Sequence, residues 1–225
     1  MQERGSQGEF NLRSPEERLS DLERKYKELE EKLWCVDCKV PRGAVLSDAD
    51  IKRLVIAKRI LITPEPDLES KVILGTCKID LRLGDSAKFI DPTKVPHIDL
   101  SRPVPGEYYH EMDIQEHSSL IIPAGMVIVA TTLERIKLPN CMIGLLVGKS
   151  RPARSGLKVE GAPIFDAGWD GKPMLELHNG GGVPLEVHYG QAICAMVFLH
   201  LSSPTLEVYA QRNGVKYANQ TKAQI

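Results

Sequence analysis

The sequence has 225 residues, of which 42% are hydrophobic, and its formal net charge is −1. This length fits one domain of ordinary size with an appendage. A net charge near zero gives no overall field for nucleic acid or an anionic membrane, so binding of a polyanion requires local charge. No apolar run is long enough to span a bilayer, and the polar N-terminus is unlike a signal peptide. We therefore expect a cytoplasmic protein with no nucleic-acid or membrane partner.

Residues 1–45 are predicted to be an N-terminal extension. Residues 1–13 are polar and lack periodicity, so disorder is expected there. Ser14 can cap a helix that begins at Pro15, with Glu17 closing a capping box. Apolar residues then recur at steps of three and four, as in a coiled-coil seam: Leu19, Leu22, Tyr26, Leu29 and Leu33. About two heptads make only a marginal helix, and a helix packed on its own domain is an equal alternative.

The five cysteines do not indicate a secreted disulfide framework. Cys35 and Cys38 have the spacing of zinc ligands, but structural zinc needs four ligands and no second pair follows. Two incidental thiols at a helix end are the favoured interpretation, and a site shared between subunits is the alternative. Cys77, Cys141 and Cys194 stand in apolar, strand-like stretches, where we expect them to be buried.

Residues 46–225 are predicted to form a mainly β domain. It begins with a helix over Asp48–Lys58, capped by Ser47. Beyond Leu74, short apolar runs alternate with Pro and Gly turns, which favours a β-barrel or jelly roll. The runs cover residues 120–122, 126–129, 142–147, 174–177, 185–187 and 193–199. The Pro-rich interval 91–106 is expected to be a surface loop.

Three polar groups in the second half of the chain together favour a nucleotide site. The first is a run of cations with a hydroxyl: Lys149, Ser150, Arg151 and Arg154. The second is the turn Asp166–Trp169, and the third is Glu176, alone in an apolar strand. A solvated loop, an ordinary turn and an exposed strand face would explain each group separately. Polyphosphate binding, sugar and base binding, and proton transfer explain them together.

The order and spacing of these groups resemble those of the dCTP deaminases, in the dUTPase-like superfamily. The resemblance runs from Val45 to the C-terminus, and further segments that carry it are 46–51, 79–84, 122–125, 130–134 and 209–220. It implies a dUTPase-like distorted β-barrel or jelly roll with an extra N-terminal helix, and a homotrimer with shared sites. The run of cations corresponds to the loop that binds phosphate in this family. Here the chain departs from the family's pattern at Lys149, Arg151 and Pro152, where Arg, Ser and Leu are usual.

The resemblance implies hydrolytic deamination of dCTP to dUTP and ammonia. Glu176 would take a proton from water and pass it to the cytosine ring, helped by a pKa raised through burial. Ser150 and Arg154 would orient Glu176 and the water, and the backbone at Ala162 would position that water. The His-x-Glu and Pro-Cys-x-x-Cys signature of zinc deaminases is absent, so no zinc is expected.

The resemblance also implies the substrate contacts. Asp166 would accept a hydrogen bond from the sugar 3′-hydroxyl, and Trp169 would pack beside the sugar. The other substrate-binding positions, apart from those already given catalytic roles, are Lys149, Arg151, Met174, Leu175, Tyr209, Lys216 and Gln220. Lys149, Arg151, Tyr209 and Lys216 would be on phosphate, with Tyr209, Lys216 and Gln220 closing over the nucleotide. Mg²⁺ would bridge the phosphates.

Other functions stay open at this point. A bifunctional dCTP deaminase and dUTP diphosphatase, giving dUMP, would keep the same glutamate. A dUTP diphosphatase alone would have an aliphatic residue in place of Glu176 and a Gly-rich tail. A non-catalytic nucleotide-binding protein is suggested by the extra helix and the altered phosphate loop. dUTP and dTTP are further candidate ligands.

Overall fold

The computed structural model describes residues 14–33, 40–41, 43–207, 209–211 and 221–223. The chain divides into two compact units, Met1–Pro41 and Arg42–Ile225. The sequence placed this boundary between residues 45 and 46. The backbone explains the difference, because the His200 amide donates to the Ala44 carbonyl (2.8 Å) and Val45 pairs with Leu199. Ala44 and Val45 therefore belong to the sheet of the larger unit.

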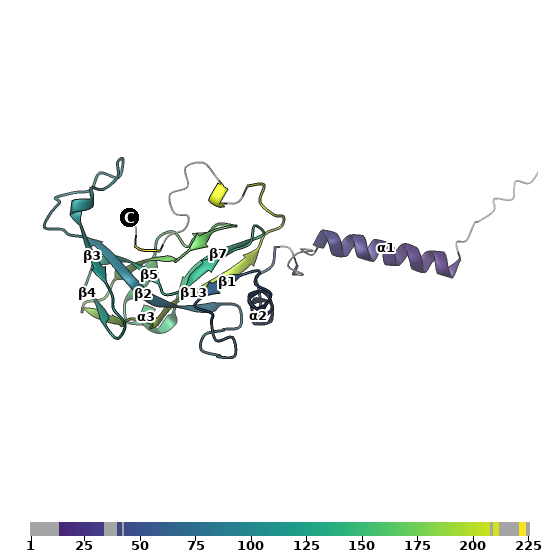
Figure 1. The fold of residues 1–225 in the computed structure, drawn as a ribbon, viewed down its shortest axis with the longest axis horizontal. Helices are drawn as coiled ribbons and strands as arrows, with labels where there is room; N and C mark the ends of the chain where they lie inside the picture. Colours follow the sequence, from purple (N-terminus) through teal and green to yellow (C-terminus); the bar gives the residue numbers. More distant parts are fainter. Residues whose placement is uncertain (1–13, 34–39, 42, 208, 212–220, 224–225) are drawn as a thin grey trace, which may run out of the picture. The chain divides into compact units, whose positions relative to one another are not determined.

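The first unit contains helix α1 (Pro15–Leu33), which begins where the sequence predicts (Figure 1). The Glu17 amide donates to the Ser14 hydroxyl (3.1 Å), and the Ser14 amide donates to the Glu17 carboxylate (2.9 Å). This reciprocal pair is the predicted capping box. Cys35 and Cys38 lie outside the described residues, so incidental thiols and a site shared between subunits both stay predictions for that pair.

The second unit is mainly β, as predicted. Its helix α2 (Asp48–Ile56) is capped by Ser47, but it ends at Ile56 instead of Lys58, whose φ of 55° is incompatible with a right-handed helix. The strands are β1 Leu61–Thr63, β2 Ile79–Ile90, β3 Tyr109–Asp113, β4 Ser119–Ile122, β5 Val127–Thr132, β6 Arg135–Lys137, β7 Met142–Gly148, β8 Leu157–Glu160, β9 Ile164–Phe165, β10 Asp170–Gly171, β11 Met174–Asn179, β12 Leu185–His188 and β13 Ala192–His200. Short helical turns are α3 Ser150–Arg154, η1 Gly106–Tyr108 and η2 Tyr209–Gln211.

Within the described residues the strands form three antiparallel sheets, of which the largest positions the polar residues of interest. Its order is β8-β11-β5-β2-β13-β7-β9, with β3 added on β2. The smaller sheets are β1-β6-β10 and β12-β4. β2 joins the two halves of the large sheet, because it pairs with β13 near its start and with β3 and β5 further on. Apolar side chains from α2, β2, β5, β11 and β13 fill the core.

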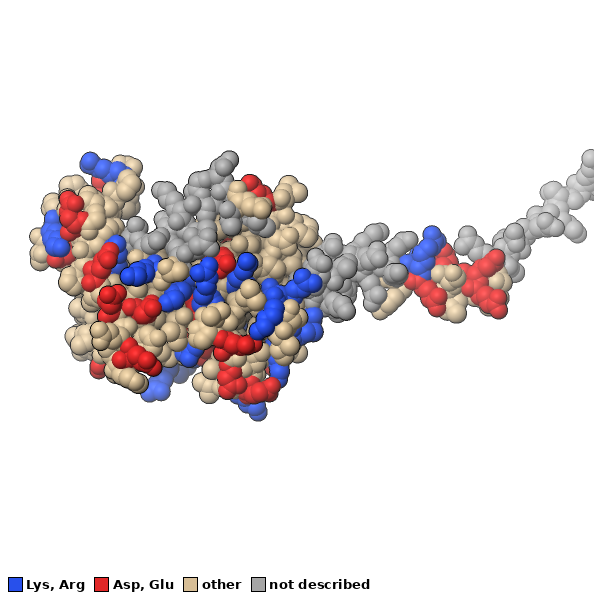
Figure 2. All heavy atoms as spheres, in the orientation of Figure 1, with Lys and Arg blue, Asp and Glu red and all other residues tan. Residues whose placement is uncertain are grey.

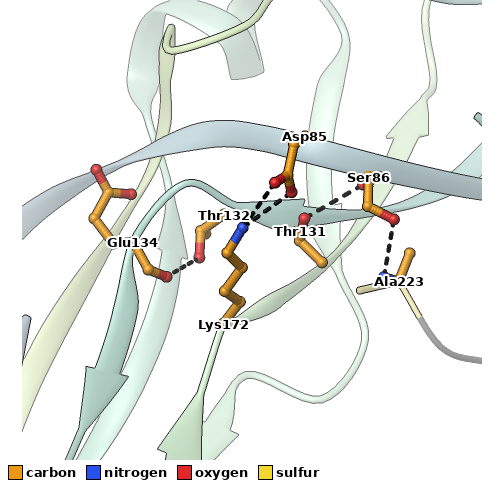
Figure 3. Close-up of polar contacts among 7 residues, drawn as sticks. All are labelled: Asp85, Ser86, Thr131, Thr132, Glu134, Lys172 and Ala223. Carbon is orange, nitrogen blue, oxygen red and sulfur yellow. Dashed lines mark hydrogen bonds and ion pairs between the residues drawn. The ribbon is translucent and has the colours of Figure 1, made fainter. Parts of the chain in front are cut away.

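Buried polar contacts hold the last described residues against β2 (Figure 3). The Ala223 amide donates to the Ser86 hydroxyl (3.1 Å), and the Thr131 hydroxyl donates to the Ser86 carbonyl (3.4 Å). Lys172 lies nearby and contacts both carboxylate oxygens of Asp85, at 3.0 and 3.1 Å. The segment 221–223 is thus tied to the middle of the large sheet.

One cysteine differs from expectation. Cys141 and Cys194 are buried, whereas Cys77 is exposed. The cause is a turn before β2, closed by the Gly75 amide donating to the Lys78 carbonyl (2.9 Å), which carries Cys77 on its outside. Burial raises the pKa of the Cys194 thiol well above its usual range, so this thiol stays protonated.

The distribution of charged and apolar side chains in the described residues agrees with the near-zero net charge of the sequence. Acidic and basic side chains are interspersed over the visible face of the larger unit (Figure 2). No described helix is both long and apolar enough to cross a membrane.

The boundary predicts a difference between two truncations. Deleting residues 1–45 should lower the free energy of unfolding by about 1–2 kcal/mol relative to deleting residues 1–39, because it removes the pairing of Ala44 and Val45 with β13. Urea denaturation of both proteins measures this difference. Equal midpoints and slopes would show that residues 40–45 add nothing to the fold.

Candidate active site

The cationic run lies where β7 passes into the short helix α3. Lys149 is the first residue after β7 and its carbonyl accepts from the Ala153 amide (3.0 Å), which starts the turn. Pro152 is tolerated because it lies in the first turn, where an N–H has no helical partner. Ser150, Arg151 and Arg154 are exposed. The loop thus offers a hydroxyl and two guanidinium groups to solvent.

Lys149 differs from its neighbours because it is paired within the chain. Its amino group contacts the carboxylate of Asp80 on β2, and the exposed fractions of the two side chains are 23% and 7%. A buried carboxylate without a partner is costly, so this pair stabilises Asp80. Sequence reasoning gave Asp80 no role, although a single acid inside the apolar start of β2 was the signal for one. Phosphate would have to compete with Asp80 for Lys149.

Glu176 lies on β11, between β5 and β8. It pairs with Val129 on one side and Glu160 on the other. Leu175 and Leu177 are fully buried in the core, and Glu176 points to the opposite face, where it is half-buried. Burial raises the pKa of the Glu176 carboxyl, partly offset by a hydrogen bond with backbone. A carboxyl with a raised pKa is suited to exchanging protons near neutral pH.

Gly161 makes the space that the Glu176 carboxyl occupies. A Cβ built on Gly161 would lie 2.3 Å from Glu176 Oε2 and 2.5 Å from its Cδ. The φ of Gly161 is +97°, which also favours glycine. Sequence reasoning singled out the adjacent Ala162 and missed Gly161, since a lone glycine after a strand reads as an ordinary turn. Gly161 therefore leaves room for the Glu176 carboxyl where a larger residue would not.

The large sheet brings three of the predicted catalytic residues into one region. The helix α3 contacts β8, β8 pairs with β11, and the exposed Ala162 follows directly after Gly161. Ser150, Ala162 and Glu176 therefore come from adjoining elements. No ion pair joins Arg154 to Glu176 among the described residues, so the role of Arg154 in holding the carboxylate stays a prediction. Met174 is half-buried on the same face as Glu176.

The turn at Asp166 is formed as predicted, but one of its residues has a different place. The Trp169 amide donates to the Asp166 carbonyl (3.0 Å), which leaves Asp166 exposed. Trp169 itself is only 3% exposed, and its ring packs edge-to-face on Phe165 with centroids 4.7 Å apart. The indole is therefore part of the core, and its place beside the sugar stays a prediction.

Of the remaining residues predicted to contact substrate, some are described by the structure and some are not. The Leu175 side chain is fully buried, so a ligand could meet only its backbone. The Tyr209 amide donates to the Ala167 carbonyl (3.1 Å), which ties the start of η2 to the Asp166 turn. Lys216 and Gln220 lie outside the described residues. Within the described ranges, no cluster of three or more His, Cys, Asp or Glu side chains could hold a metal ion.

Comparison with known proteins identifies this arrangement. The sequence profile of the family described as dCTP deaminase-like matches residues 45–201, which is well over half of the chain. The chain belongs to the dCTP deaminase-like family. The dCTP deaminase of Thermomicrobium roseum is 37% identical over 178 residues, covering 78% of this chain and 89% of that protein. The dCTP deaminase of Rhodospirillum rubrum is 37% identical over 182 residues, covering 78% and 92%.

A solved structure shows the fold of this family. The crystal structure of a 2′-deoxycytidine 5′-triphosphate deaminase from Agrobacterium tumefaciens matches with a TM-score of 0.55 at 20% identity. The match covers 70% of this chain and 48% of that one. The predicted mainly β fold with an extra N-terminal helix is confirmed. The helix α1 lies outside the residues that the dCTP deaminase-like profile matches.

Proposed function

We propose that this protein deaminates dCTP to dUTP and ammonia by hydrolysis. The observation that carries the proposal is Glu176, a half-buried carboxyl with a raised pKa, set above Gly161 on a strand of a dCTP deaminase-like fold. The names of the 37%-identical relatives support the same substrate. A dUTP diphosphatase attacks phosphorus and has no use for a proton relay at the base. A cytoplasmic location is part of the same proposal.

In the proposed reaction, Glu176 carries one proton between water and the base. Its carboxylate takes a proton from water, and the hydroxide bonds to C4 of cytosine. The carboxylic acid then gives this proton to the ring nitrogen N3, the proton of the new C4 hydroxyl passes to the amino group, and the bond between C4 and the exocyclic nitrogen breaks to release ammonia and leave the C4 carbonyl. Ser150 and the backbone at Ala162 would orient the water. Arg154 is on the adjoining helix, where substrate could draw it toward Glu176.

The substrate contacts follow from the same geometry. Arg151 and Arg154 are exposed and Lys149 is held by Asp80, so phosphate would meet the guanidinium groups first. Asp166 is free to accept a sugar hydroxyl. Mg²⁺ would enter with the triphosphate and neutralise part of its charge. A homotrimer whose sites lie between subunits is part of the same proposal.

Product analysis tests the proposal. Purified protein is incubated with dCTP and Mg²⁺, with and without a zinc chelator, and dUTP, dUMP, pyrophosphate and ammonia are separated. Equimolar dUTP and ammonia, unaffected by the chelator, are expected. Ammonia with dUMP and pyrophosphate would show the bifunctional reaction, and dUMP from added dUTP alone would show a diphosphatase. Nucleotide binding without any product would overturn an enzymatic function.

The raised pKa of Glu176 predicts a shifted pH profile. The carboxylate is the active form, so turnover should fall as pH decreases through this pKa. Because burial raises the pKa, the fall should begin at a higher pH than an ordinary exposed glutamate would allow. The turnover number measured against pH checks this. An acid limb within the range of an exposed glutamate would contradict the desolvated environment.

The cations of α3 should have separable effects. Arg151→Ala should chiefly raise the Michaelis constant for dCTP, whereas Arg154→Ala should chiefly lower turnover. Lys149→Ala should also destabilise the fold, because it leaves the Asp80 carboxylate without its partner. The double variant Lys149→Ala/Asp80→Asn removes that penalty and isolates the effect on phosphate. Identical changes in both constants at all three positions would refute separate roles.

A further inference from the structure

The helix α1 carries an apolar stripe that the proposed reaction does not use. Leu19, Leu22 and Tyr26 are 59%, 63% and 65% exposed. They stand at successive a and d positions of a heptad, and the sequence continues the register with Leu29 and Leu33. Contiguous exposed apolar residues rimmed by polar ones mark a protein interface. We therefore expect a binding partner for the stripe.

The charges on either side of the stripe indicate which partner it binds. With Leu19 at a, the e positions are Glu16, Glu23 and Glu30, and the g positions are Arg18, Lys25 and Lys32. Every e position is acidic and every g position is basic, so one flank of the stripe is negative and the other positive. Both signs are visible on the described part of the helix in Figure 2.

Lys25 also contacts Asp21 on its own helix (3.4 Å), but the alternation of e and g charges fits a parallel pair of helices. Neighbours on one helix are three or four positions apart, whereas Arg18 and Glu23 are five apart. In a parallel coiled coil, a g residue meets the e residue of the next heptad on the other helix. Arg18 then faces Glu23 of the partner subunit. In an antiparallel pair, g would face g and e would face e, which brings like charges together.

We propose that α1 is a parallel, in-register coiled-coil segment whose partners are the same helix of other copies of this chain. The apolar stripe forms the seam and the g and e residues set the orientation. The inference does not rest on the proposed reaction, because α1 lies outside the residues that the family profile matches. A parallel bundle has the cyclic symmetry of a homotrimer, so it is compatible with the assembly proposed above.

Cross-linking of the full-length protein tests the seam. In a parallel, in-register pair, identical d positions face each other, so Leu22→Cys should give covalent dimers on mild oxidation. The controls are the parental protein, which measures the background from the native cysteines, and Arg24→Cys, which stands at an f position on the outer face. We expect a severalfold higher dimer yield from Leu22→Cys than from either control. Equal yields would overturn the proposal, whether the stripe packs on its own chain or on a different protein.

Charge reversal in the Leu22→Cys protein tests the orientation. Arg18→Glu places acid opposite Glu23 of the partner subunit and should lower the dimer yield about two- to fivefold. Adding Glu23→Arg should restore the yield, because the pair is rebuilt with its signs exchanged. Arg24→Glu makes the same charge change away from the seam; it also removes the ion pair of Arg24 with Asp21, so it measures the effect of losing a contact within the helix, and the yield should fall much less than with Arg18→Glu. A loss that Glu23→Arg does not restore, or an equal loss with Arg24→Glu, would overturn the parallel register.

Discussion

Replacing Glu176 by Gln should lower the turnover of dCTP by about a hundred- to ten-thousand-fold, which is the usual contribution of general acid–base catalysis. Gln keeps the shape of the side chain and its place above Gly161, but it cannot accept the proton of the attacking water. Nucleotide affinity should change little, because the cations on α3 and the turn at Asp166 are untouched. Ammonia release gives the turnover, and equilibrium binding of dCTP gives the affinity.

Glu186→Gln is the matched control. Glu186 also lies on a strand, β12, but it is exposed and accepts a hydrogen bond from the Ser119 hydroxyl (2.7 Å). This variant should have parental turnover. If Glu176→Gln also turns over at the parental rate, another group must move the proton and the proposed mechanism is wrong.

Replacing Gly161 by Ala should lower turnover by about a hundredfold with a smaller change in affinity. The new methyl group would lie 2.3 Å from Glu176 Oε2, so the carboxyl must move. A displacement of about 1 Å at a reacting group can cost two orders of magnitude in rate. The pH profile adds a readout, because a carboxyl pushed out toward water should lose its raised pKa and shift the acid limb to lower pH.

The change at Gly161 combines a clash with backbone strain, and Gly125 separates the two. Gly125 has a similar φ, +76°, but its Cβ would meet nothing within 4 Å. Gly125→Ala therefore reports the cost of the strain without touching Glu176. A loss of turnover in Gly125→Ala equal to that in Gly161→Ala would mean that Gly161 acts through stability and not by positioning the carboxyl.

Local signals in the sequence predicted the local structure well. Ser14 and Glu17 form their capping box because both partners lie within one turn of helix. The alternation of Leu175, Glu176 and Leu177 placed the acid on the opposite face from the core, because side chains alternate along a strand. These predictions needed only neighbouring residues, and the structure confirms them.

Predictions that depended on distant partners were less successful. Asp80 and Lys149 are 69 residues apart in sequence, so nothing local showed that the lysine would be paired. Trp169 belongs to a turn, a kind of segment that usually lies at the surface, yet its ring packs on Phe165 in the core. Cys77 looked like a strand residue, and the turn closed by Gly75 and Lys78 put it outside. The family resemblance supplied residue types and spacing, but not these tertiary contacts.

The burial of Trp169 gives this protein an internal optical probe. The sequence has two tryptophans, and deleting residues 1–39 removes Trp34, so the shortened chain has a single indole. That indole is shielded from water and should emit at short wavelength. It stands three residues after Asp166, on the turn whose Ala167 carbonyl receives the Tyr209 amide. Its emission should therefore respond when nucleotide engages the turn or when the contact with Tyr209 is lost, and stopped-flow fluorescence can time both events without a label.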